Sequence, residues 1–64
     1  MTVSKAELSS LSTAVQELEQ RITRSGEELL GTINEGVAID LFEVERSLRT
    51  ARRRLEKAQE GLRE

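Results

Sequence analysis

The sequence predicts an all-α protein: an antiparallel, coiled-coil-like helical hairpin that dimerises into a four-helix bundle. Apolar residues recur at alternating spacings of 3 and 4 in both halves of the chain, and strand-like alternation is not sustained anywhere. The 64 residues include no Pro, no Cys and no His, and one aromatic residue, Phe42. A chain this short buries only about 60% of its unfolded surface. Without disulfides or the usual zinc ligands, it needs association with a second copy as its stabiliser.

The first helix is predicted over residues 4–30. Ser4 to Glu7 matches a capping box, in which the Ser4 hydroxyl and the Glu7 carboxylate bond to the first free backbone N–H groups. The apolar series begins directly afterwards, at Leu8.

A turn is predicted over residues 31–34. Gly31 suits the left-handed residue that ends a helix, and Thr32–Glu35 matches a second capping box. Residues 25–28 match the same motif, but a break there would leave two very unequal arms. The turn at 31–34 therefore gives the matched lengths that an antiparallel hairpin requires.

The second helix is predicted over residues 35–63, so that residues 1–64 form a single helical domain. Its apolar residues repeat the alternation of the first helix, and the two series together form the predicted oligomer seam. The seam consists of Leu8, Leu11, Val15, Leu18, Ile22, Leu41, Val44, Leu48, Ala51, Leu55, Ala58 and Leu62.

The competing interpretation is a single long helix in a dimeric coiled coil. Leu29, Ile33, Val37 and Leu41 continue the apolar stripe at a spacing of 4 through the central glycines. Such a helix would be about 95 Å long and would need a partner along its whole length. The cap at the turn and the equal arms favour the hairpin.

Two further groups of residues are candidates for binding a partner. Ile39 and Phe42 lie on a helix face that the seam does not use, which predicts packing against a second hairpin or another helical protein. Spacings of 3, 4 and 4 place a series of cations on one outer face. This basic face, which extends from Arg46 to Lys57, is either solvated or binds an acidic protein or a phosphate-bearing ligand. The candidate partner-binding residues are Ile39, Phe42, Arg46, Arg49, Arg53 and Lys57.

Charge is distributed unevenly along the chain. Residues 1–36 carry a net charge of −3, whereas residues 46–57 carry +5. If the chain folds back at residue 32 or 33, Glu19 is expected to face Arg46. Such exposed pairs contribute only about 0–1 kcal/mol each, so they set register more than stability.

Composition excludes several functions. Without His or Cys the chain lacks the commonest general base and the strongest nucleophile, so no enzyme, cofactor or metal site is expected. A net charge of −2 does not suit a nucleic-acid binder, and no apolar run is long enough to span a membrane or act as a signal peptide, so a cytoplasmic location is expected. The predicted function is non-enzymatic protein–protein interaction, as an oligomerisation, adaptor or scaffold module acting through the seam. The alternative is a small regulatory protein that binds an anionic partner through the basic face.

Overall fold

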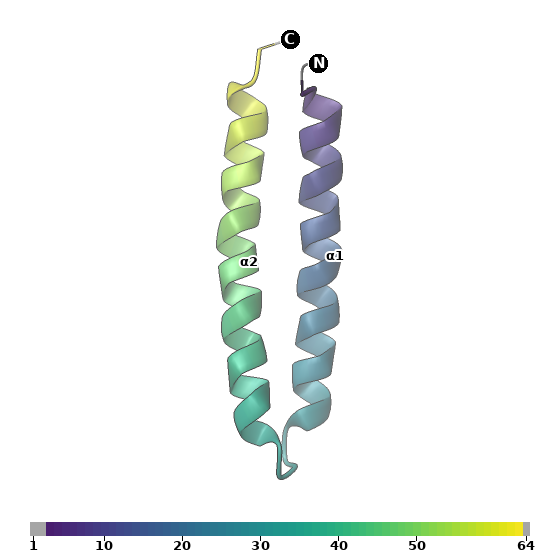
Figure 1. The fold of residues 1–64 in the computed structure, drawn as a ribbon, viewed down its shortest axis with the longest axis vertical. Helices are drawn as coiled ribbons and strands as arrows, with labels where there is room; N and C mark the ends of the chain where they lie inside the picture. The colour runs from purple at the N-terminus through teal and green to yellow at the C-terminus, as the bar shows by residue number, and fades with distance from the viewer. Residues whose placement is uncertain (1–2, 64) are drawn as a thin grey trace.

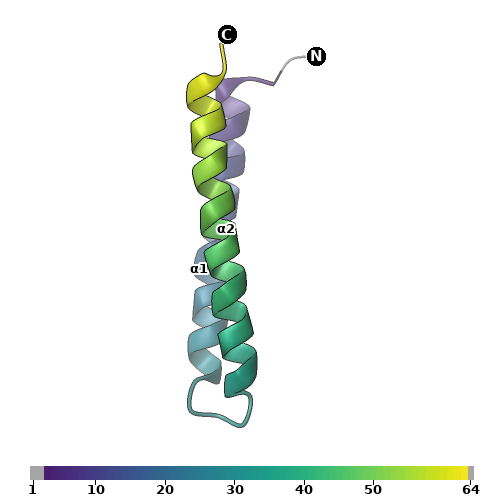
Figure 2. The same ribbon diagram turned by 90° about the vertical axis from the view of Figure 1, so that its left-hand side faces the viewer.

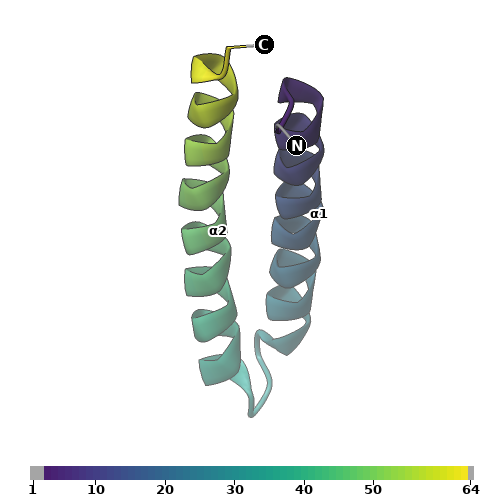
Figure 3. The same cartoon turned by 45° about the horizontal axis from the view of Figure 1, so that its top comes forward.

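Two helices make up the computed structural model, which describes residues 3–63: α1 (Lys5–Leu29) and α2 (Glu35–Gly61). They run antiparallel, with the start of α1 beside the end of α2 and the connecting turn at the far end (Figure 1). The view tilted forward also shows them side by side along their length (Figure 3). The molecule measures 50 × 15 × 14 Å. The predicted all-α hairpin is confirmed, and the single long helix is not the fold of this chain.

The start of α1 follows one half of the predicted capping box, the bond to Ser4, and a capping bond to the Glu7 carboxylate is not among those of the described residues. The Ser4 Oγ accepts a hydrogen bond of 3.1 Å from the backbone N–H of Glu7. This bond satisfies one of the first N–H groups of the helix, which have no partner within the helix itself. The other end of α1 closes with a bond from the Leu30 N–H to the Glu27 carbonyl oxygen, 3.3 Å long.

The turn between the helices depends on Gly31 and Thr32. Gly31 has φ of +75°, and no other described residue has a positive φ. The Thr32 hydroxyl donates to the Leu29 carbonyl at 2.6 Å and accepts from the Asn34 N–H at 3.1 Å. The second predicted capping box is wrong in detail, because Asn34 is the cap residue of α2 and its side chain makes no capping bond. Thr32 instead ties the open loop seen in Figure 2 to the end of α1.

A second central glycine, Gly26, lies inside α1 and has a packing role. The ring of Phe42 covers it so closely that a Cβ atom placed on Gly26 would lie 2.6 Å from Cε1 of Phe42. Only a residue without a side chain lets the ring approach in this way. The contact joins the two helices close to the turn.

The two arms meet along a continuous seam, at residues spaced alternately by 4 and 3. On the first arm these residues are Leu8, Ser12, Val15, Glu19, Ile22, Gly26 and Leu29. On the second arm they are Ala38, Leu41, Glu45, Leu48, Arg52, Leu55, Gln59 and Leu62. Every second position of each series is therefore polar or small. As a result, Ala38 is the one fully buried apolar residue among those described, and no large side chain is completely covered. Neither helix of the described chain has the length and apolarity that crossing a membrane requires.

Candidate interaction surface

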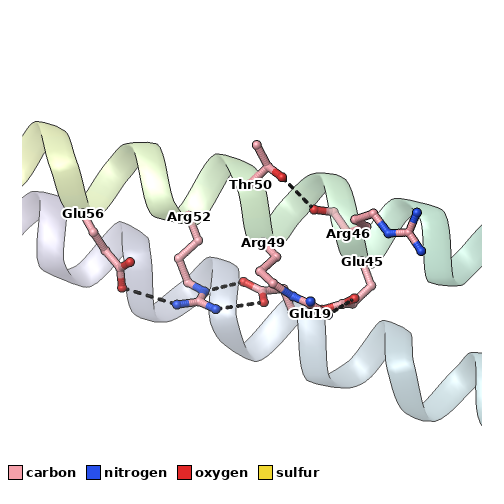
Figure 4. Close-up of polar contacts among 7 residues, drawn as sticks. All are labelled: Glu19, Glu45, Arg46, Arg49, Thr50, Arg52 and Glu56. Carbon is pink, nitrogen blue, oxygen red and sulfur yellow. Dashed lines mark hydrogen bonds and ion pairs between the residues drawn. The ribbon is translucent and has the colours of Figure 1, made fainter.

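An ion pair between the helices lies at the middle of the seam. Glu19 on α1 is only 5% exposed, and its Oε2 accepts a hydrogen bond of 2.6 Å from the Nε of Arg52 on α2. The Arg52 Nη2 also donates to the Glu19 Oε1 at 3.3 Å, and its Nη1 donates to the Glu56 Oε2 at 3.3 Å (Figure 4). The hydrogen bond to Glu19 raises the pKa of the Arg52 guanidinium above its usual value. The pair therefore satisfies the one charge that α1 buries in the seam.

The expected pairing of Glu19 with Arg46 is wrong. Arg46 instead contacts Glu43 on its own helix at 3.2 Å, and Arg52, six residues further on, reaches Glu19. Side chains of a helix lean toward its N-terminus. In an antiparallel pair the two side chains therefore lean in opposite directions, and each meets a residue beyond the one directly opposite. The predicted turn is therefore correct, but pairing residues by their distance from the turn does not predict which side chains meet.

The basic face is partly neutralised by carboxylates of α2 itself. Arg49 bonds to Glu45 at 2.7 Å, and this hydrogen bond raises the pKa of the Arg49 guanidinium. Arg46 is held by Glu43 in the same way. Two of the four predicted cations of this face thus have partners, whereas Arg53 and Lys57 are exposed outside the seam.

One side of the hairpin is polar and slightly hollowed. A shallow open groove of about 450 Å³ runs beside the Glu19–Arg52 pair. Its lining consists of Gln16, Glu19, Gln20, Thr23, Arg24, Glu45 and Arg52. Among the described residues, no group of carboxylates is arranged to hold a metal ion.

The opposite side of the hairpin carries the apolar face. We define this face by six residues: Leu11, Leu18, Val37, Val44, Ala51 and Ala58. All six are exposed, and the four large ones are between 41% and 48% exposed. Each of them directly precedes a polar or small residue of the seam, such as Ser12 or Glu19. One residue corresponds to about 100° around a helix, so all six flank the seam on the same edge of their helices. In an antiparallel pair, equivalent flanks lie on one side of the molecule.

The structure thus divides the predicted oligomer seam into two sets. Leu8, Val15, Ile22, Leu41, Leu48, Leu55 and Leu62 lie half-buried between the two helices. Leu11, Leu18, Val44, Ala51 and Ala58 lie on the apolar face, together with Val37.

The polar members of the seam were missed by sequence reasoning. From Leu8 onward, the series through Ser12, Val15 and Glu19 has the same alternation of 4 and 3 as a coiled-coil repeat. Because this series contains a serine and a glutamate, the neighbouring leucine series has the stronger apolar pattern and predicts the seam instead. The signal for these polar positions is in α2, where Glu45 and Arg52 carry charges one heptad apart and so lie on the same face of the helix.

The two apolar partner-binding candidates are separated in the structure. Phe42 is half-buried against Gly26, on the side of the polar groove. Ile39 is 59% exposed and lies on the outer surface of α2, away from the apolar face. They do not form one patch.

Comparison of the chain with protein-family models, with curated proteins and with solved structures gives no significant match.

Proposed function

We propose that this protein is a non-enzymatic protein–protein interaction module that assembles with a second copy of itself through the apolar face. The observation that carries the proposal is the exposure of Leu11, Leu18, Val37 and Val44 along one side of a hairpin that completely buries no large side chain among its described residues. Large apolar side chains grouped on one side mark an association surface.

The surface area of the hairpin supports this proposal. The chain exposes 5084 Å², whereas a folded protein of 7.2 kDa typically exposes about 4,100 Å². The excess is about 1,000 Å², and one partner in a standard interface buries about 800 Å². A second hairpin on the apolar face would therefore restore the exposure expected of a folded protein.

The molecular mass in solution tests the proposal. Light scattering at micromolar concentration is expected to give twice the chain mass of 7.2 kDa. The double substitution Leu11→Gln and Leu18→Gln removes four leucines from the dimer. Each leucine is only 41–44% exposed in the hairpin, so covering that exposed part contributes about 0.6–1.3 kcal/mol, and the loss of all four should weaken association by roughly a hundredfold or more.

The substitution Ile39→Gln is the matched control, because Ile39 is equally apolar and exposed but lies outside the apolar face. It should leave the mass and the dissociation constant unchanged. A wild-type chain that is folded and monomeric over the whole micromolar range would overturn the proposal. Equal effects of Ile39→Gln and of the leucine substitutions would overturn it as well.

A further inference from the structure

Along α2, the residues of the apolar face and those beside it on the outward side change in size and charge at the middle of the helix. The large residues Val37 and Val44 precede the midpoint, and the small residues Ala51 and Ala58 follow it. Beside them lie Asp40, Ser47 and Arg54, which are spaced by seven, each three residues after a member of the apolar face, and all exposed. Large and acidic residues therefore occupy the first half, and small and basic residues the second.

The net charge of the whole helix reverses at the same place. Residues 35–45 carry four acids and no base, a net charge of −4, whereas residues 46–57 carry +5. Several of these charges are paired on α2 or with Glu19. Neither Asp40 nor Arg54 has a charged partner within the described chain.

We propose that two copies associate with their turns at opposite ends, so that α2 packs antiparallel against α2 of the second copy. This inference rests on the proposed self-association and adds its orientation. A two-fold axis near Ser47 places each Asp40 beside Arg54 of the second copy. The same axis sets Val44 against Ala51, and Val37 against Ala58, so that a large residue meets a small one in each case.

The hairpin places α1 suitably for the same axis. The contacts of Gly26 with Phe42 and of Glu19 with Arg52, once the lean of the side chains is allowed for, place residues whose numbers sum to about 67 at one height. Ser47 therefore lies at about the height of residue 20. A two-fold axis there brings Leu18 close to Leu18 of the second copy.

The opposite orientation, with both turns at one end, is less favourable in charge. It also pairs large residues with small ones, such as Leu11 with Ala58, so size does not choose between the two arrangements. It sets the −4 segment of α2 beside residues 22–32 and the +5 segment beside residues 10–21, and each of these two segments of the second copy has a net charge of only −1. With the turns at opposite ends, the −4 segment faces the +5 segment twice. Complementary charge across an interface fixes its register and orientation.

The distance between two turns tests this orientation directly. The chain has no cysteine, so Ile33→Cys, at the fully exposed loop position, takes one spin label per chain. Turns at opposite ends predict a separation close to the 50 Å length of the hairpin. Turns at the same end predict about 20 Å, the width of two helices, and this result would overturn the proposal.

A second labelled position distinguishes failure of the orientation from failure of the dimer. Thr50→Cys lies near the middle of α2, so any dimer brings its two labels within about 30 Å, whichever way the turns point. Coupling at position 50 with a short distance at position 33 would refute the orientation alone. Monomeric mass without coupling at position 50 would refute the proposed function and this inference together.

Charge reversal tests the predicted contact itself. Arg54→Asp should raise the dissociation constant about tenfold or more, because it sets two pairs of like charges together. The matched control Arg53→Asp changes the same charge on the outer face and should have a much smaller effect. Adding Asp40→Arg to Arg54→Asp should restore most of the affinity. If the double variant binds no better than Arg54→Asp alone, the pairing is refuted.

Discussion

Gly26 shows that a residue with poor helix propensity can stabilise this fold through a contact. Glycine in a helix interior costs about 1 kcal/mol relative to alanine. At Gly26 that cost is offset by the ring of Phe42, which packs where a side chain would otherwise stand. Phe42 is in turn kept half-buried, although it belongs to the polar side of the hairpin.

We predict that Gly26→Ala destabilises the protein despite the better helix propensity of alanine. The new Cβ would lie 2.6 Å from the ring, so the ring must turn outward or the helices must separate. Overpacking of this kind costs about 1–3 kcal/mol, more than the roughly 1 kcal/mol gained in propensity. Urea unfolding followed by circular dichroism measures the difference. The control Gly36→Ala, which meets no atom within 4 Å, should be neutral or stabilising. A stabilising Gly26→Ala would show that the contact with Phe42 is unimportant.

At the scale of the helices, the turn determines that the chain forms a hairpin and not one long helix. The apolar stripe continues through residues 29–41, so the pattern of hydrophobic residues permits both. Gly31 decides, because its φ of +75° reverses the direction of the chain, and Thr32 fixes the loop to the end of α1.

We predict that Gly31→Ala destabilises the hairpin by about 1–2 kcal/mol, because a residue with a Cβ is strained in the left-handed region. No atom lies within 4 Å of the position, so the loss would come from backbone strain alone. Gly31→Asn should lose less, since asparagine tolerates this conformation best among the other residues. Urea unfolding of the three proteins ranks them. Equal losses for Ala and Asn would point to a cause other than backbone strain.

The helices, the turn and the first cap could be predicted from sequence, because each depends on local preferences. The face of each helix that meets the other could be predicted only in part. Leu8, Val15 and Ile22 belong to two overlapping repeats, one continued by Leu11 and Leu18 and one by Ser12 and Glu19. Periodicity alone does not choose between them. The choice depends on Glu19 finding Arg52 and on Gly26 receiving Phe42, which are contacts between residues far apart in the chain.

At the scale of the whole molecule, the polar seam and the apolar face lie on different sides of the same two helices. Glu19 and Arg52 fix the register of the hairpin, because a shift of either helix would leave a charge buried without its partner. The pair gives little apolar burial, and part of the chain's large apolar surface, at Leu11, Leu18, Val37 and Val44, lies outside the seam. With the proposed self-association, the register within the chain and the stability gained from a second copy depend on different sides of the same two helices.

This division predicts that thermal stability depends on protein concentration. If the hairpin were stable alone, its melting temperature would be the same at every dilution, because all its contacts are intramolecular. If the native state is a dimer, each tenfold increase in concentration stabilises it by about 1.4 kcal/mol, which should raise Tm by about 5 °C for two 64-residue chains. Circular dichroism melts over a hundredfold concentration range measure this slope. Leu11→Gln with Leu18→Gln should lower Tm at every concentration, whereas Ile39→Gln should leave both Tm and slope unchanged. A wild-type Tm that stays constant over this range would mean that the seam alone, with its buried ion pair and half-covered leucines, holds the chain folded.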